Sequence, residues 1–159
     1  LGVRFAQLLH PHGIPTEPSA PQPVVPASAS EQVALYELRF TLPGGQNVDH
    51  MHSLSPDEGV PSYQASGVQP LSLWRDGGPD RIPLYRCFNG GGINHFLSTD
   101  AHCGGFQQEA LMGYLNAAGG QPLYRCFSAA LQDHRVVVDD PGVCAATGYH
   151  VEGILGYVP

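Results

Sequence analysis

Residues Pro83–Asp100, PLYRCFNGGGINHFLSTD, are largely repeated by residues Pro122–Asp139, PLYRCFSAALQDHRVVVD. The motif Leu-Tyr-Arg-Cys-Phe begins at Leu84 and begins again at Leu123, a shift of 39 residues (123 minus 84). An internal repeat of this length indicates that the chain is assembled from one small structural unit used more than once. The repeat therefore decides the fold class.

A third, fainter copy lies upstream, beginning at Leu35 and lacking both cysteines. Every copy carries an acid or amide followed by histidine, and a small residue followed by tyrosine near its end. The first set is Asp49-His50, Asn94-His95 and Asp133-His134, and the second is Ser62-Tyr63, Gly113-Tyr114 and Gly148-Tyr149. These matches predict three units, at about residues 33–82, 83–121 and 122–159.

The composition favours strands over helices. Charged residues make up only 13% of the chain, while it contains 20 Gly and 15 Pro. Such a mixture is typical of a turn-rich β domain. Three units of about forty residues, each made of short strands, predict an all-β, β-trefoil-like domain whose three-fold closure would hide its strand edges. A repeat-built open sheet or a small propeller-like arrangement is the alternative.

The first 32 residues are predicted to lie outside this domain. Residues 1–9 carry apolar side chains at the spacing of a short helix, and residues 15–30 contain five prolines, typical of an extended linker. We expect residues 1–32 to be the tail of an upstream region and residues 33–159 to form the β module. Within the module, Gln107–Met112 is expected to make one helical turn.

The charge balance argues against two classes of partner. The net charge is −7, and all seven basic residues are Arg. We therefore expect no nucleic-acid binding, which needs clustered positive charge, and no electrostatic attachment to anionic lipid. The sequence also has no apolar run of the length of a membrane span.

The four cysteines are predicted to form one disulfide within each of the last two units, Cys87–Cys103 and Cys126–Cys144. Their spacings are similar, 16 and 18 residues, and both members of the pair are missing together from the first unit. Four free buried thiols are the alternative, whereas a zinc site is disfavoured because no two cysteines are closely spaced. Disulfides indicate an oxidising compartment, so we expect a secreted, extracellular or periplasmic protein.

The repeated motif, together with Gly148–Val158, GYHVEGILGYV, resembles the DUF5648 repeat module. The resemblance covers about residues 33–159 and is weakest in the first copy, where Glu37 stands in place of the motif's arginine. Cys103 is another departure, since the family usually carries Glu near this position. The resemblance implies a β-trefoil-like, lectin-like accessory module of secreted proteins, often found beside hydrolase domains.

The three acid–histidine pairs and Trp74 are the candidate ligand-binding residues. Asp49, His50, Asn94, His95, Asp133 and His134 could hydrogen-bond the hydroxyls of a sugar while an aromatic ring stacks on its apolar face. Alternatively, the histidines are structural and satisfy polar groups of the framework. Trp74 precedes a Gly-rich turn found in one unit, and it could contact a ligand or line the core.

The sequence offers no catalytic motif and no complete metal-ligand set. His50 and His52 alternate on a predicted strand and could clasp a metal, but we expect no metal and no other cofactor. The preferred hypothesis is a non-catalytic secreted module that binds carbohydrate or a cell-surface polymer and targets an attached hydrolase. The alternative is a structural or protein-interaction domain that docks on an upstream catalytic domain.

Overall fold

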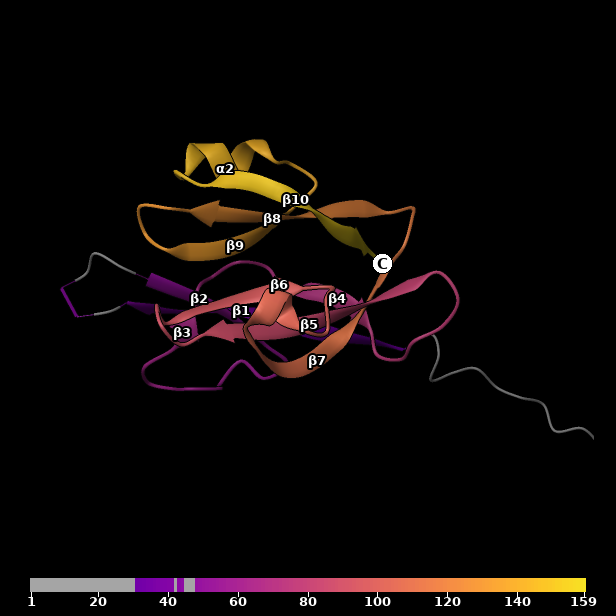
Figure 1. Cartoon of the computed structure of the whole chain (residues 1–159). Coiled ribbons are helices and arrows are strands. Elements are labelled where there is room, and N and C mark those ends of the chain that lie inside the picture. Colours follow the sequence, from indigo (N-terminus) through magenta and orange to yellow (C-terminus); the bar gives the residue numbers. More distant parts are fainter. Residues whose placement is uncertain (1–30, 42, 45–47) are drawn as a thin grey trace, which may run out of the picture.

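A computed structural model describes residues 31–41, 43–44 and 48–159, and the fold is all-β, as predicted. The helix and linker expected within residues 1–30 lie outside the described residues. The described chain forms ten strands, a 3₁₀ turn and one short helix (Figure 1). In chain order they are β1 (Gln32–Thr41), β2 (Val48–Ser53), β3 (Gln64–Ala65), β4 (Leu71–Trp74), β5 (Arg81–Asn89), β6 (Asn94–Ser98), η3 (Cys103–Gly105), β7 (Gln107–Asn116), β8 (Gln121–Ser128), β9 (Asp133–Val138), α2 (Gly142–Ala146) and β10 (His150–Val158).

One pairing scheme recurs in each of the three predicted units. The first strand of the unit is central and pairs antiparallel with the strand of its hairpin on one side and with the closing strand on the other. Thus β1 lies between β2 and β4, β5 between β6 and β7, and β8 between β9 and β10. The closing strands then join the units, because β7 pairs with β4 and with β10.

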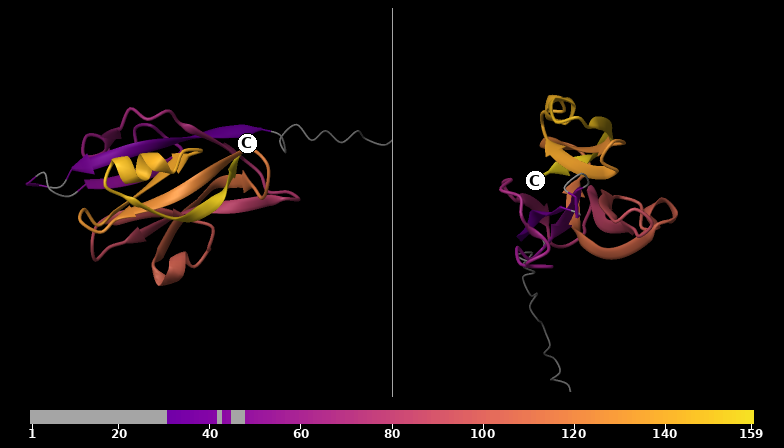
Figure 2. Two further views of the ribbon diagram at one scale, coloured as in Figure 1. Left: turned by 90° about the horizontal axis from the view of Figure 1, so that it is seen from above. Right: turned by 90° about the vertical axis from the view of Figure 1, so that its left-hand side faces the viewer.

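The equivalent leucines of the three copies meet in one core. Leu35, Leu84 and Leu123 are each 0% exposed and belong to the same apolar cluster. Figure 2 shows the three units as three lobes that meet at a common centre, where the hairpin strands β2, β6 and β9 contact one another. The repeated leucine therefore marks the position at which each unit packs on the other two.

A glycine allows the closing strands β4 and β7 to approach each other closely. A Cβ atom on Gly113 of β7 would lie 2.8 Å from the carbonyl oxygen of Trp74 and 3.0 Å from the Leu73 side chain. Any larger residue would push β7 away from β4 at the point where the first two units join.

Both predicted disulfides are confirmed: Cys87 is bonded to Cys103 and Cys126 to Cys144. All four cysteines are buried, and each bond ties the central strand of its unit to the segment just before the closing strand. The chain-entropy model attributes roughly 3 kcal/mol of stability to closing a loop of this length. Among the described residues, no helix is long and apolar enough to cross a bilayer.

Two local features differ from expectation. The helical turn expected at Gln107–Met112 is wrong, because these residues lie in β7 and pair with β5 along its length. Tertiary pairing has overridden their individual helix propensity. The helix α2 was not expected; it contains Cys144, whose disulfide fixes it against β8. The β-trefoil-like arrangement stays a prediction.

The core assignment predicts a contrast between two leucines. Replacing Leu84 by Ala should cost about 2–5 kcal/mol, because the fully buried side chain leaves a cavity. Leu111 is 42% exposed, and the same change there should cost no more than about 0.5 kcal/mol. Urea unfolding of the two variants measures both; equal losses would contradict the shared core.

Candidate functional site

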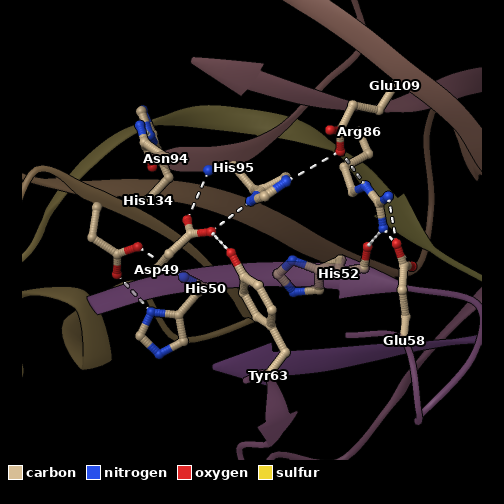
Figure 3. Close-up of polar contacts among 11 residues, drawn as sticks. Asp49, His50, His52, Glu58, Tyr63, Arg86, Asn94, His95, Glu109 and His134 are labelled. Carbon is tan, nitrogen blue, oxygen red and sulfur yellow. Dashed lines mark hydrogen bonds and ion pairs between the residues drawn. The ribbon is translucent and has the colours of Figure 1, made fainter. Parts of the chain in front are cut away.

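The acid–histidine pairs contact each other across the units rather than within them. The carboxylate of Asp49 accepts hydrogen bonds from the backbone N–H and ring Nδ1 of His95, at 2.7 and 2.5 Å (Figure 3). Asp133 accepts the same two bonds from His50, at 2.9 and 2.6 Å. Each histidine therefore bonds to the acid of the preceding unit, and the third unit is linked back to the first.

The contact between the second and third units differs from these two. Here Asn94 replaces the acid, and its amide Nδ2 lies 2.9 Å from Nδ1 of His134. An amide nitrogen can only donate, so the proton of the His134 ring is on Nε2, which faces Glu152 Oε1 at 3.2 Å. Burial lowers the pKa of His134, which agrees with a neutral ring.

A tyrosine completes each of the two acid sites. The Tyr63 hydroxyl donates to Asp49 Oδ2 at 2.6 Å, and the Tyr149 hydroxyl donates to Asp133 Oδ2 at 2.5 Å. Tyr63 is the residue just before β3, and Tyr149 is the residue just before β10. In the second unit the residue just before the closing strand β7 is Phe106, not Tyr114. The expected equivalence of Tyr114 is therefore wrong: it lies within β7, opposite Trp74.

The pKa values of these groups follow from burial and hydrogen bonding. Burial raises the pKa of Asp49, but the hydrogen bonds from His95 and Tyr63 outweigh burial and hold this pKa below its ordinary value. Burial and the neighbouring carboxylates raise the pKa values of Tyr63 and Tyr149 well above the ordinary range. The two tyrosines thus remain protonated donors at neutral pH.

Arginine and glutamate form a second set of contacts. Arg86 donates from Nε to Glu109 at 2.8 Å and from a terminal nitrogen to the carbonyl oxygen of His52, in the first unit, at 2.9 Å. The matching residues of the third unit, Arg125 and Glu152, make the same ion pair at 2.8 Å. Arg125 also donates to the carbonyl oxygen of Leu97, in the second unit, at 3.0 Å.

The first unit carries a negative charge at the position where the other two units carry this arginine. Glu37 stands where the other copies have arginine, and it receives a hydrogen bond at 3.2 Å from Arg135 of the third unit. Glu58 forms a two-point contact with Arg86, which together with a bond from Ser53 lowers the pKa of Glu58 to about 2. The bonds that arginines donate to residues of another unit hold the units together, and they favour a framework role for most of the candidate residues.

One groove adjoins this network, with a volume of about 510 Å³. It lies between the second and third units and combines aromatic and polar side chains. Of the residues predicted from the sequence, Asn94 and His134 line it, whereas Asp49, His50, His95 and Asp133 do not. Residues that the sequence analysis missed include Phe96, Asp100, Phe106, Arg125, Phe127 and Glu152.

A comparable groove of about 410 Å³ lies between the third and first units. Its lining contains the buried Tyr149 and two arginines, Arg39 and Arg135. In the groove between the second and third units, Phe106 takes the place of Tyr149 and is 49% exposed. Only this one of the two grooves therefore offers an open aromatic ring.

Asn94 is also the place where the polar network is incomplete. Its side chain is buried, with the residue 5% exposed, and its Oδ1 has no hydrogen-bond partner among the described residues. In the two acid sites, three donors surround the carboxylate. At Asn94 the atom that faces the histidine ring is Nδ2, and Oδ1 matches the oxygen that accepts a histidine backbone N–H in the acid sites. Among the described residues it receives no such bond, and Phe106 supplies no hydroxyl beside it.

Trp74 lies away from both grooves. Its indole Nε1 donates to Asn116 Oδ1 at 2.8 Å, and the Arg81 guanidinium lies over the ring at 4.1 Å from its centroid. A ring covered by a cation is not available for stacking on a ligand on that face. The contacts place Trp74 at the junction of β4 and β7, and its suggested role in ligand binding stays a prediction.

His50 and His52 lie on β2, two residues apart, and both are buried. The part of the chain described by the structure contains no group of three or more His, Cys, Asp or Glu side chains arranged to hold a metal ion. His50 is instead engaged with Asp133, while His52 Nε2 lies 3.9 Å from Glu37, beyond hydrogen-bond distance.

These observations define an all-β domain whose repeats are joined by a polar network that leaves one aromatic groove open. Residues 62–159 match a family described as a domain of unknown function, DUF5648. The chain belongs to this family. The match begins near the end of the first unit, which is the copy that resembles the family motif least. No curated protein and no solved structure matches the chain in the same comparisons.

The buried His52 predicts a loss of stability in acid. Burial lowers its pKa from 6.5 to about 4, so between these values the unfolded chain binds a proton that the folded protein does not. Stability is therefore present above pH 6.5 and falls as the pH falls toward 4, by roughly 2 kcal/mol between pH 7 and 5 from this residue alone.

Urea unfolding of the H52Q variant at pH 7 and pH 5 tests this prediction. The variant should lose about 2 kcal/mol less than the wild type over this interval. The matched control is H102Q, because His102 is exposed and its replacement should leave the pH dependence unchanged. An unaltered pH dependence in H52Q would refute the assignment.

Proposed function

We propose that this protein is a non-catalytic module that binds carbohydrate and holds an attached hydrolase near a polysaccharide or cell-surface polymer. The observation that carries the proposal is the groove between the second and third units. A sugar ring is polar at its rim and apolar on its C–H faces, so a site for it needs aromatic and polar side chains together. The groove supplies both.

The apolar part of the groove consists of three phenylalanines. Phe106 is half exposed and packs edge-on against Phe96, with ring centroids 5.8 Å apart. Phe127 is covered by His134, whose ring lies 4.6 Å away. Phe106 is therefore the ring that a sugar can stack on, while the other two form the wall behind it.

The polar part is held in place before any ligand arrives. Arg125 is fixed by Glu152 and by the Leu97 carbonyl, and Glu152 also faces His134. Side chains already fixed in position lose little conformational entropy when a ligand binds. Such an arrangement suits recognition of hydroxyl groups by geometry.

Two broader features belong to the same proposal. We infer that the three units are arranged around a common axis as in a β-trefoil, which the recurring strand pairing and the shared leucine core support. Both disulfides support a location outside the cytoplasm, where cystines persist. The proposal includes no cofactor, no nucleic acid and no membrane attachment.

A third groove supports the alternative, a domain that docks on another protein. It has a volume of about 280 Å³ and is mainly aliphatic, with Leu71, Val136 and Val138 in its lining. Val68 and Val143 at this groove are 47% and 43% exposed. Aliphatic side chains give a sugar no aromatic face, so this surface fits a protein partner better.

The carbohydrate proposal predicts a selective loss of binding on changing one ring. The wild type should bind oligosaccharides on a glycan array and in calorimetry, and F106A should weaken binding at least tenfold, because it removes the stacking face. The matched control is L111A, since Leu111 is exposed to a similar extent but does not line the groove. Absence of binding to every glycan and insoluble polymer would overturn the proposal.

A further inference from the structure

The three contacts between units share one arrangement of side chains, and the contact between the second and third units differs from the other two in two residues. In two of them an aspartate accepts from a histidine backbone N–H, from the histidine ring and from a tyrosine hydroxyl. In the third, both the acid and the tyrosine are changed together, to Asn94 and Phe106. The paired change removes one charge and one hydroxyl from the same place.

The change from aspartate and tyrosine to Asn94 and Phe106 removes the buried charge, and it also removes a hydrogen-bond donor. A buried carboxylate without enough donors is costly, so an aspartate at this position would need the tyrosine. An amide carries no charge and tolerates the loss, yet its carbonyl oxygen still requires a donor. Among the described residues Oδ1 of Asn94 has none, and this residue, which is 95% buried, lines a groove of about 510 Å³.

We propose that a hydroxyl group of a neutral sugar enters the space left by the absent tyrosine hydroxyl, beside the Nδ2 atom that faces His134, and donates a hydrogen bond to the neighbouring Oδ1 of Asn94. The inference rests on the proposed function and names the point in the groove at which the ligand is recognised. Asn94 is then a specificity-determining residue, and Phe106 stacks on the same sugar ring.

The surroundings indicate how the hydroxyl reaches this atom. Less than 1 Å² of Oδ1 is accessible in the structure, so the ligand must move a neighbouring side chain. Phe106 is the groove residue suited to this, because it is 49% exposed and its ring contact is an edge-on one with Phe96. Tyr149, its counterpart in the other groove, is held by Asp133 and is 6% exposed.

The charges of the groove select a neutral ligand over an acidic one. The charge of the Arg125 guanidinium is already balanced by Glu152, which its Nε contacts at 2.8 Å. Asp100 lines the same groove, and backbone N–H groups of His102 and Gly104 lower its pKa and keep it ionised. A uronic acid would therefore meet a like charge without a free cation to balance it.

The test restores the arrangement of the other two units. In the double variant N94D/F106Y, the new hydroxyl can donate to the new carboxylate as Tyr149 donates to Asp133. The single variant F106Y adds one oxygen atom in the space that the ligand hydroxyl is proposed to enter. Binding is measured by calorimetry with cellopentaose, chitopentaose and laminaripentaose as neutral probes and trigalacturonic acid as an acidic one.

We expect the wild type to bind at least one neutral probe and to bind trigalacturonic acid at least tenfold more weakly. Both variants should lose at least tenfold in affinity for the neutral probe and should unfold at a higher temperature than the wild type. The Y149F variant, which alters the other groove, should keep wild-type affinity.

Three results would overturn the inference. If F106Y and N94D/F106Y bind the neutral probe as the wild type does, the ligand does not occupy the tyrosine position, although the carbohydrate proposal stands. If trigalacturonic acid binds best, the assignment of a neutral ligand is wrong. If the wild type binds none of the probes and no glycan on an array, the proposed function fails and the inference fails with it. Should the double variant not fold, F106Y alone decides between these results.

Discussion

The buried carboxylate of Asp133 ties the last unit of the chain to the first through three hydrogen bonds, two from His50 and one from Tyr149. A charge removed from water is tolerated only when donors surround it, and most of the donors here come from a different unit. The acid of the first unit, Asp49, depends in the same way on His95 of the second. No unit can therefore satisfy its own buried polar groups alone, and the three must assemble together.

This dependence explains why the same feature recurs in every unit without being a binding site in each. The histidines are held between an acid or amide on one side and, for His95 and His134, a glutamate on the other. We propose that a ligand binds where the repeat is imperfect. With Asn94 and Phe106 in place of acid and tyrosine, an acceptor without a partner among the described residues lies at a groove that also holds an exposed ring.

The sequence predicted the all-β class and both disulfides because these depend on short-range signals: the repeat itself, turn residues and cysteine spacing. It also singled out the acid–histidine pairs as either ligand-binding or framework residues. It could not show that each histidine bonds to another unit, since that depends on how the units pack. Phe106 was missed because the copies were aligned on Tyr114. Alignment on the residue just before β7 and β10 would have matched Phe106 with Tyr149.

The coupling between His50 and Asp133 is the most direct measure of the network. Urea unfolding of H50A, D133A and the double variant gives the interaction free energy between two residues 83 positions apart. We predict a coupling of at least about 1 kcal/mol, with the double variant losing less stability than the sum of the single variants. Additive losses, with a coupling near zero, would contradict the claim that these contacts hold the three units together.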